Sequence, residues 1–285
     1  MIQQKLSVLI ILYEENFEMI NNCLENVKDF KIIIIDNANN KSLKNEIKKK
    51  FKIHKYFLNK KNIGFSKAAN QGIRACETEY LLILGADCLI TYSSIEKLMI
   101  AKEKYKNCFL TSPTIYDHSG KLTYNGGALD EGIIEYGTFE SAGDVCIEAV
   151  LTTAILFKIK DIINIGLFDE EFFLYFLDND LSRRIKNIKK SIIQVYNAKA
   201  THETGHLKVK NRFKKIFFSN FYFYYEELYY YYKINSHQKK YNYFKKKIPK
   251  FLVKIIINFI LFRFDKLTYN LSKVLAFYKF TKLIK

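Results

Sequence analysis

Apolar runs alternate with amphipathic segments along the first part of the chain. Continuous apolar, β-branched runs, typical of strands, cover residues 6–12, 31–35, 80–84, 109–112 and 150–157. Between the early runs, apolar residues recur at helical spacing over residues 17–27, 42–51, 66–76 and 93–105. Ser42 and Ser93 are the expected N-caps of two of these helices, with Glu96 completing a capping box. Because strands that are apolar throughout alternate with helices, the pattern predicts an α/β fold with a doubly wound, mostly parallel sheet flanked by helices.

Polar residues stand where several of these strands would end. The carboxyl ends of neighbouring parallel strands meet at one edge of a sheet, and ligands bind beyond that edge. Turn formation alone would explain Asn, Asp or Gly in any single loop, but not their position at one edge after several strands. The residues expected at this edge are Tyr13, Glu14, Asp36, Asn62, Gly64, Gly85 and Asp87.

The glycine patterns that usually bind phosphate are missing from this edge. No GxGxxG follows the first strand and no GxxxxGK[ST] occurs, which argues against a dinucleotide fingerprint and a P-loop. A phosphate ligand would therefore need another partner, and a divalent metal ion on carboxylates is the expected one.

Two acidic residues stand at the start of an expected helix near residue 180. Residues 166–187 read GLFDEEFFLYFLDNDLSRRIKN, which places aromatic residues directly before Asp178 and Asp180. Acids at a helix N-terminus also cap the helix and favour its dipole, and that structural role stays open. A carboxylate among aromatic side chains has a raised pKa and suits a general base. Asp178 is the stronger candidate of the two.

Two histidines follow in the sequence ATHETGH. His202 and His206 have the i, i+4 spacing of zinc ligands on a helix, but Gly205 between them favours a loop. His202 alone, as a further ligand of an oxygen-bound metal ion, is the preferred interpretation.

The positive charge of the chain is concentrated at its C-terminal end. Residues 208–285 contain 19 Lys and Arg against 3 acidic residues, whereas residues 1–207 contain 27 against 26. We therefore expect a nearly neutral domain over residues 1–207 and a basic helical extension over residues 208–285, which holds 23 of the 45 aromatic residues.

The extension is expected to lie on a membrane surface. Its apolar stretch 251–264 is too short, and too interrupted by Lys254, Asn258 and Arg263, to span a bilayer. It suits an interfacial helix on an anionic membrane. Packing of the extension on the neutral domain is the main alternative. Nucleic-acid binding is not expected, because RNP-like and helix-turn-helix patterns are missing.

Further bulk features bear on location. The five cysteines lie far apart and form no CxxC pair, which favours reduced thiols. The apolar run 6–12 leads into acidic residues and is expected to be a buried strand rather than a signal peptide. The sequence contains no stretch of 18 uninterrupted apolar residues, so we expect no membrane-spanning helix. The expected location is cytoplasmic, peripheral on the inner face of the cytoplasmic membrane.

Taken in order, these segments resemble the inverting family-2 glycosyltransferases of the GT-A fold, notably the bacterial rhamnosyltransferase-like members. The resemblance covers roughly residues 6–206. It is most specific in NIGFSKAANQGI (62–73) and IGLFDEEFFLYFLDNDLSRRIK (165–186), which are similar to long blocks of the family pattern. Four shorter segments match more weakly: SVLIILYEEN matches the opening strand and IIIIDNANN the nucleotide-binding strand. LLILGADC matches the metal motif and THETGH the histidine loop.

Two positions depart from the family pattern. Gly85 stands where the family usually has Asp or Asn, and Leu177 replaces the acid that commonly precedes the catalytic aspartate. These departures suggest an alternative, a non-catalytic module that binds a sugar nucleotide or a glycan. Because Asp178 is retained, we expect an active enzyme.

The resemblance also implies roles for individual residues. Tyr13 and Asp36 would contact the nucleotide, and Asp87 with His202 would hold Mg²⁺ or Mn²⁺ across the diphosphate. Asp178 would take a proton from the acceptor hydroxyl in one inverting displacement. The residues assigned to the donor are Tyr13, Asp36, Asn62, Gly64, Asn70 and Asp87. The residues assigned to the acceptor are Asn125, Gly126, Thr153 and Asp180.

The expected substrates follow from the same resemblance. The donor would be a UDP- or dTDP-sugar, and the acceptor a glycan or a lipid-linked oligosaccharide. The reaction would belong to the assembly of bacterial cell-surface polysaccharide, lipooligosaccharide or glycoprotein glycans. A lipid-linked acceptor would also agree with a basic extension at the membrane surface.

Overall fold

A computed structural model describes residues 2–124, 126–130, 133–136, 141–202 and 211–284. Their contacts divide the chain into two compact units. The α/β unit comprises the described residues of Met1–Glu170 and Leu177–Gly205. The helical unit comprises those of Glu171–Phe176 and His206–Lys285. The short segment Glu171–Phe176 therefore belongs to the helical unit, although both of its neighbours in the sequence belong to the α/β unit.

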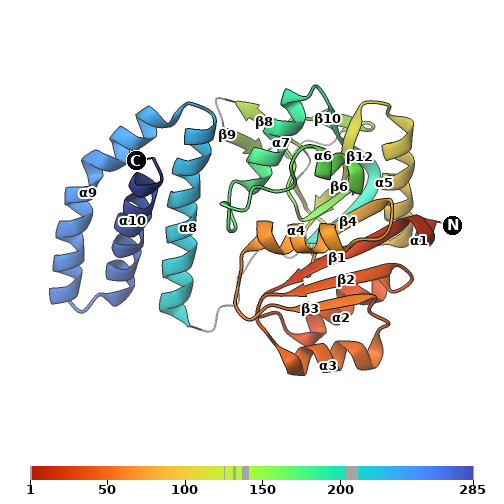
Figure 1. Ribbon diagram of the computed structural model, residues 1–285, viewed down its shortest axis with the longest axis horizontal. Helices are drawn as coiled ribbons and strands as arrows, with labels where there is room; N and C mark the ends of the chain where they lie inside the picture. The colour runs from red at the N-terminus through yellow and green to blue at the C-terminus, as the bar shows by residue number, and fades with distance from the viewer. Residues whose placement is uncertain (1, 125, 131–132, 137–140, 203–210, 285) are drawn as a thin grey trace. The chain divides into compact units, whose positions relative to one another are not determined.

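Within the described residues, the α/β unit is built on a ten-stranded sheet (Figure 1). Its main path follows the order β10 (Val145–Ile147), β12 (Ser191–His202), β6 (Cys108–Tyr116), β11 (Ala154–Lys158), β4 (Tyr80–Gly85), β1 (Leu6–Leu12), β2 (Lys31–Asp36) and β3 (Lys55–Leu58). Off this path, β12 pairs with β5 (Cys88–Ile90) and β6 pairs with β7 (Leu122–Tyr124). A separate two-stranded sheet contains β8 (Gly127–Asp130) and β9 (Ile133–Tyr136).

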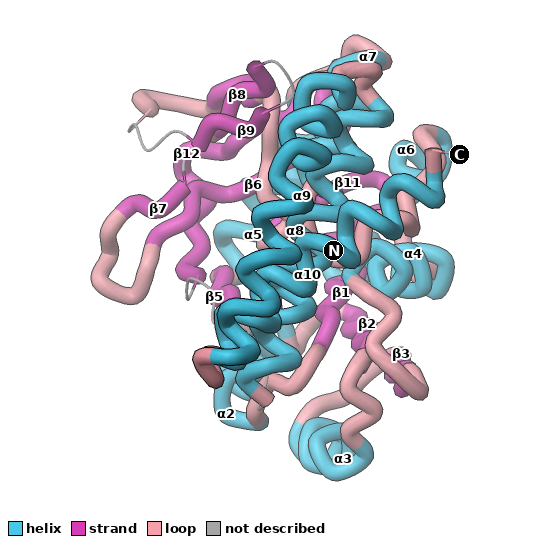
Figure 2. The backbone as a smooth tube through the Cα atoms, turned by 90° about the vertical axis from the view of Figure 1, so that its left-hand side faces the viewer, coloured by secondary structure: helices cyan, strands magenta, loops and turns pink. Residues whose placement is uncertain are grey.

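The strands are parallel in one half of the sheet and mixed in the other. Strands β4, β1, β2 and β3 run parallel, as the strand–helix alternation predicts. Strand β11 lies antiparallel to both β4 and β6. Strands rather than a long helix fill the connection from β6 to β11, and an antiparallel neighbour needs no crossover helix. The expectation of a mostly parallel sheet therefore describes the half from β4 to β3. Figure 2 shows β1, β2 and β3 of this half, with α3 beyond them.

Helices cover both faces of the sheet because successive strand residues point to opposite sides. Val8 and Ile10 of β1 pack in the same core as α2, α3 and α5, whereas Leu9 points to the other face. There α4 approaches so closely that a Cβ on Gly72 would lie 2.4 Å from Leu9 Cδ1. The helices of this unit are α1 (Ile2–Lys5), α2 (Phe17–Val27), α3 (Lys41–Lys50), α4 (Phe65–Ala75), α5 (Tyr92–Lys104), α6 (Ile159–Asn164) and α7 (Leu177–Asn187).

The N-caps of α3 and α5 differ from the predicted ones. The Asn40 side chain accepts a hydrogen bond from the backbone N–H of Leu43, and Thr91 caps α5 in the same way. The predictions of Ser42, and of Ser93 with its capping box to Glu96, are therefore wrong. Asn40 and Thr91 already place an acceptor oxygen in front of the first turn of each helix.

The helical unit contains three long helices, α8 (Arg212–Lys233), α9 (His237–Ile260) and α10 (Phe264–Leu283). Helix α10 lies between the other two (Figure 1). Their shared core consists of the buried residues Tyr225, Leu228, Phe244, Ala276 and Phe280. This confirms the expected helical extension. Among the described residues, no helix combines the length and the apolar character needed to cross a bilayer.

Candidate active site

The parallel register brings the ends of β1, β2 and β4 to one edge of the sheet. Across neighbouring strands, Leu12 is paired with Asp36, and Ile11 is paired with Gly85. Tyr13 follows β1 directly, at the same level. The structure therefore places these segments at the edge where the sequence pattern predicts a ligand.

Asp36 ends β2 with its side chain fully buried. Its carboxylate accepts hydrogen bonds from the backbone N–H groups of Ala38 at 2.8 Å and Asn40 at 3.3 Å. The Tyr56 hydroxyl donates a third bond at 3.1 Å, and burial together with the nearby Asp36 charge raises the pKa of Tyr56. These bonds hold the carboxylate and the loop that follows β2 in one position.

Glu15 is a site residue that the sequence reasoning did not identify. Burial, with smaller contributions from the nearby carboxylates of Asp87 and Asp36, raises the pKa of its carboxyl group to about 7. The backbone N–H of Tyr13 donates a hydrogen bond to the Glu15 carboxylate. The edge therefore carries three acidic groups close enough to interact electrostatically, which is an environment that favours a bound cation. The only signal in the sequence was a second glutamate after Tyr13.

Asp87 and His202 meet although they lie far apart in the sequence. Strand β12 pairs antiparallel with β5, and this register places His202 opposite Cys88, the residue after Asp87. The Nε2 atom of His202 lies 3.2 Å from Oδ1 of Asp87, and both side chains are partly exposed, 21% and 29%. The two residues predicted as metal ligands therefore lie together at an accessible position.

These two side chains fit a divalent metal ion that is shared with a substrate. A carboxylate oxygen and an imidazole nitrogen suit Mn²⁺, and Mg²⁺ in nucleotide sites is commonly held by one or two carboxylates plus phosphate oxygens. In the described part of the chain, no cluster of three or more His, Cys, Asp or Glu side chains forms a complete metal cage. The remaining ligands would then come from a diphosphate and water. His206 lies outside the described residues.

Gly85 leaves space for the Asp87 carboxylate. A Cβ atom at Gly85 would lie 3.0 Å from Asp87 Oδ1 and 3.5 Å from the carbonyl oxygen of Thr153. The backbone N–H of Gly85 donates a 2.7 Å hydrogen bond to that same carbonyl. The pairing of β4 with β11 therefore brings Gly85, two residues before Asp87, against Thr153.

The neighbouring residue, Thr152, contacts Asp178. Asp178 stands in the first turn of α7, and its carboxylate accepts hydrogen bonds from the side chain and the backbone of Thr152. Burial nevertheless raises the pKa of Asp178 to about 6. Its Oδ1 atom is buried and has no hydrogen-bond partner among the described residues. Two consecutive residues, Thr152 and Thr153, thus contact the Asp178 carboxylate and the strand end that precedes Asp87.

Asn62 and Gly64 shape the start of α4. The backbone N–H of Gly64 donates a 2.9 Å hydrogen bond to the Asn62 side chain, and the Asn37 side chain donates to the Gly64 carbonyl at 3.3 Å. Gly64 has a φ of +86°, in the left-handed region that favours glycine. Both residues lie at the ligand edge, next to the loop that follows β2.

Asn70 has a different environment from the one expected of a donor-binding residue. Its side-chain amide donates to the Phe168 carbonyl at 2.9 Å and to the Glu170 carboxylate at 3.0 Å. Its Oδ1 accepts from the Phe168 backbone N–H at 3.0 Å. Since both amide N–H groups are used and the residue is buried, Asn70 holds the loop that precedes α7.

Asp180 is engaged in a structural ion pair. Its carboxylate lies 2.8 Å from Nε of Arg184 one turn later, and Arg184 also donates to the Ile165 carbonyl at 2.8 Å. Gly126 lies against Ile147 of β10 and Gln194 of β12, and Asn125 lies outside the described residues. The structure thus brings Thr153, among the residues assigned to the acceptor, next to the Asp87 loop.

The sequence profile described as "Glycosyl transferase family 2" matches residues 7–149, which is half of the chain. This chain belongs to glycosyl transferase family 2. The matched region includes the strand-end residues of β1, β2 and β4 and the loop of Asp87. A comparison with curated proteins finds no match.

Solved structures similar to this glycosyltransferase have the GT-A fold. GalNAc-T7 with UDP, GalNAc and Mn²⁺ aligns with a TM-score of 0.61 at 15% identity, over 79% of this chain and 51% of that one. The mannosyltransferase PcManGT from Pyrobaculum calidifontis, in complex with GDP-Man and Mn²⁺, gives 0.55 at 11% identity, over 81% and 64%. TarS 1–349 from S. aureus gives 0.53 at 14% identity, over 76% and 64%. This chain therefore spans between half and two thirds of the length of these proteins.

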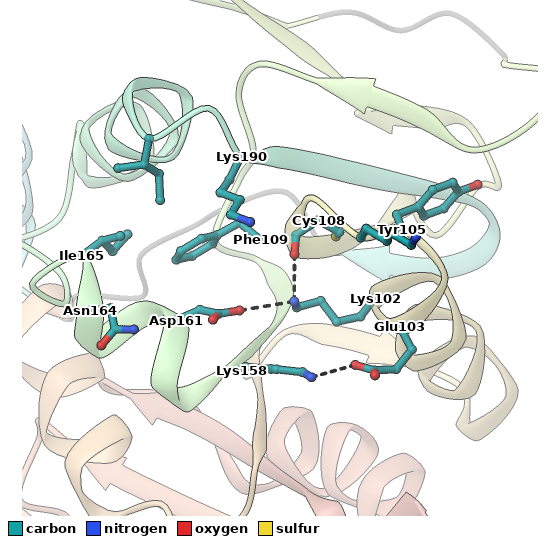
Figure 3. Close-up of a pocket in the computed structure, with 12 residues that line it drawn as sticks. Lys102, Glu103, Tyr105, Cys108, Phe109, Lys158, Asp161, Asn164, Ile165 and Lys190 are labelled. Atoms are coloured by element: carbon teal, nitrogen blue, oxygen red, sulfur yellow. Dashed lines mark hydrogen bonds and ion pairs between the residues drawn. The ribbon is translucent and has the colours of Figure 1, made fainter.

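A separate pocket lies at the opposite edge of the sheet of this glycosyltransferase (Figure 3). It is lined by the first residues of β6 and the last residue of β11, away from the strand ends that carry the candidate site. Two of its lysines are already neutralised, since Lys102 bonds Asp161 and the Cys108 carbonyl, and Lys158 pairs with Glu103. We therefore place the chemistry at the edge with Asp87 and Asp178.

Proposed function

We propose that the protein is a metal-dependent, inverting glycosyltransferase that moves a sugar from a nucleoside diphosphate to a hydroxyl group of an acceptor. One observation carries this proposal. Thr152 donates hydrogen bonds to the Asp178 carboxylate. The next residue, Thr153, accepts a hydrogen bond from the backbone N–H of Gly85, two residues before Asp87. These contacts support a proton acceptor close to the proposed position of the leaving diphosphate.

Asp178 has the properties of a general base for this step. Its Oδ1 atom is buried without a partner among the described residues and can accept a proton from an acceptor hydroxyl. The raised pKa of about 6 places the group near the pH range in which a base is effective. As the proton moves to Asp178, the acceptor oxygen forms a bond to the anomeric carbon. The bond from that carbon to the phosphate oxygen breaks, and its electron pair leaves with the nucleoside diphosphate. One displacement inverts the configuration without a covalent intermediate.

Asp87 and His202 are the proposed holders of Mg²⁺ or Mn²⁺. When bound there, the ion would neutralise the negative charge that develops on the leaving diphosphate. The 3.2 Å separation of the two side chains supports a shared ion, and the Glu15 carboxyl group nearby adds to the negative potential. GalNAc-T7 and PcManGT, both of the same fold, were solved with Mn²⁺.

The donor is proposed to lie along the strand ends. We assign Tyr13 and the loop fixed by Asp36 to the nucleoside, in a UDP- or dTDP-sugar, and Asn62 with Gly64 to the same ligand. Asn70 holds the loop before α7 instead, because its amide is bonded to Phe168 and Glu170. The nucleotides named with similar structures, UDP and GDP-Man, support a nucleoside diphosphate as the donor class.

The acceptor is proposed to be a glycan, in particular a lipid-linked oligosaccharide used in bacterial surface-glycan assembly. Support comes from the exposed apolar residues near the junction of α9 and α10, including Ile256 (61% exposed), Phe259 (64%), Ile260 (64%) and Phe262 (79%). Lys254, Arg263 and other basic residues lie in the same stretch of sequence. Apolar side chains flanked by cations are typical of helices at an anionic membrane surface. We therefore propose peripheral attachment at the inner face of the cytoplasmic membrane.

A non-catalytic binding module is the second candidate, suggested by Gly85 and Leu177. Leu177 is 3% exposed and packs in the interior, so the acid that commonly stands here would be buried at this position. Gly85 gives the Asp87 carboxylate room. Both departures therefore have structural reasons that leave Asp178 intact. Asp178→Asn is the direct test, since it should end transfer while donor binding persists.

A further inference from the structure

Glu226 of α8 is a buried acid within the helical unit, with no exposed surface. Its carboxylate accepts hydrogen bonds from three consecutive backbone N–H groups. The N–H of Phe173 lies 2.7 Å from Oε1, and those of Leu174 and Tyr175 lie 3.1 Å and 2.6 Å from Oε2. These residues form neither helix nor strand, so one side chain from a distant helix supplies the partner for each of these amides.

Burying a carboxylate at this position costs free energy, because the charged group loses its contact with water. Burial raises the pKa of Glu226 and outweighs the lowering effect of the three N–H donors and the nearby Lys279 charge, which leaves the pKa at about 8. An apolar side chain would avoid the desolvation cost but would leave three amides without a partner. The arrangement therefore fixes the backbone of residues 173–175 in a way that packing alone would not.

Aromatic contacts hold the same segment against α8. The ring of Phe173 stacks on Tyr222 with centroids 3.9 Å apart. Phe176 packs on Phe223 and Tyr230, with centroids 5.5 Å and 5.8 Å away. Phe176 has a φ of +57°, a strained conformation for a residue with a side chain, which persists only where the surroundings impose it.

The segment ends two residues before Asp178. Phe176 is followed directly by Leu177, the first residue of α7, and then by the proposed base. On the other side, Asn70 holds the backbone of Phe168. The chain that leads into α7 is thus fixed by Asn70 in the α/β unit and by Glu226 in the helical unit.

We propose that Glu226 is a positioning residue for catalysis, which fixes the backbone of residues 173–175 and thereby the place of Asp178. This inference rests on the proposed function of Asp178 as the base. It gives the helical unit a part in the chemical step, in addition to any part in location. A displacement of about 1 Å at a reacting group can cost about 10²-fold in rate, so a small shift of this segment is sufficient.

Glu226→Gln tests the inference, with Glu227→Gln as the matched control. Glutamine keeps the size of the side chain but turns one oxygen into an N–H donor, so at least one of the three amides loses its acceptor, that of Phe173 if the remaining oxygen takes the Oε2 position. Glu227 is the next residue on α8, and its carboxylate pairs with Lys240 at 2.6 Å rather than with the segment. Both variants remove one acid and one set of partners from the same helix.

The expected result is a split between turnover and binding. Glu226→Gln should lower kcat by about 10- to 100-fold and leave the KM for the nucleotide sugar within about twofold. Hydrogen exchange at the amides of residues 173–175 should speed up in the same variant. Glu227→Gln should change neither. Should Glu226→Gln not fold, Glu226→Asp keeps the charge on a shorter side chain and should show a smaller kcat loss with the same unchanged KM.

The outcomes separate this inference from the proposed function. If Glu226→Gln, or Glu226→Asp in its place, has the kcat of Glu227→Gln while Asp178→Asn is inactive, the positioning role is wrong and the base remains. A loss through KM alone, or equal losses in both glutamine variants, would also overturn it. If Asp178→Asn keeps normal turnover, the proposed function itself fails.

Discussion

The Asp178 carboxyl group combines hydrogen bonds from Thr152 with a second oxygen that is buried and has no partner among the described residues. Asp180, two residues later on the same helix, is buried as well but pairs with Arg184 at 2.8 Å. Two acids in one helical turn therefore have different environments. The difference assigns them different roles, since one is poised to accept a proton and the other ties α7 to its surroundings.

The raised pKa of Asp178 predicts an acid limb in the pH dependence of turnover. Its ordinary value is near 3.8, and burial raises it to about 6. Only the ionised carboxylate can act as the base, so kcat should rise about tenfold per pH unit below pH 6 and level off above it. Stability changes in the opposite direction, because ionising this buried group as the pH rises from about 4 to 6 lowers the free energy of unfolding. Single-turnover rates between pH 5 and 8 measure the limb, and a flat profile down to pH 5 would contradict the assignment.

Residue roles could be predicted from the sequence only in part. Asp178, Asp87 and His202 stand out by residue type and position after predicted elements. Glu15 does not, and Asn70 has contacts other than those expected of a donor-binding residue, because both depend on partners from other loops, such as Asp87 and Phe168. A hydrogen bond between distant segments leaves no local pattern in the chain.

At the scale of elements, the proposed metal pair of Asp87 and His202 depends on an antiparallel contact between β5 and the end of β12. The apolar runs predict β1, β2 and β4 well, because these strands are buried on both faces. Strand β12 extends over polar residues up to His202, and β5 has only three residues. Neither strand therefore has an apolar run long enough to be recognised from the sequence. The sequence therefore indicated both ligands but not the pairing that joins them.

The paired ligands predict a metal requirement that depends on His202. Transfer should need Mn²⁺ or Mg²⁺ and stop on chelation with EDTA. His202→Ala should raise the Mn²⁺ concentration for half-maximal activity by at least about tenfold, because one of two protein ligands is lost. His54→Ala is the control, since His54 pairs with Glu77 at 3.1 Å elsewhere on the α/β unit. An unchanged Mn²⁺ dependence in His202→Ala, or full activity in EDTA, would refute the metal site.

On the scale of the whole molecule, the helical unit includes a short segment of chain whose neighbours in the sequence belong to the α/β unit. The charge pattern suggests a division near residue 207, where the basic extension begins. Charge gives no sign that residues 171–176 belong with the extension, because their attachment depends on Glu226 and on stacked rings. Removing residues 208–285 would therefore remove a support of the α7 segment along with any membrane contact. Point substitutions are the better test of location.

Exposed apolar residues of α9 predict binding to anionic vesicles. Ile256→Ser, Phe259→Ser and Ile260→Ser together should reduce binding to vesicles rich in anionic phospholipid by at least about tenfold, since burying each side chain is worth about 1.5–3 kcal/mol. Wild-type protein should bind these vesicles more strongly than phosphatidylcholine vesicles, and high salt should weaken binding. Ile100→Ser with Ile163→Ser, exposed positions of the α/β unit, is the control. Co-sedimentation that is equal for the triple variant and wild type would exclude this surface.

The central claim is that Asp178 is the base of an inverting sugar transfer. The most direct measurement compares Asp178→Asn with Asp161→Asn, an acid that pairs with Lys102 at the opposite edge of the sheet. With a nucleotide sugar that wild-type protein uses, Asp178→Asn should lose about 10²–10⁴-fold in transfer while donor affinity stays within about twofold. Asp161→Asn should transfer at the wild-type rate, and the wild-type product should have the inverted anomeric configuration. Near-normal transfer by Asp178→Asn, or a product with retained configuration, would contradict the account.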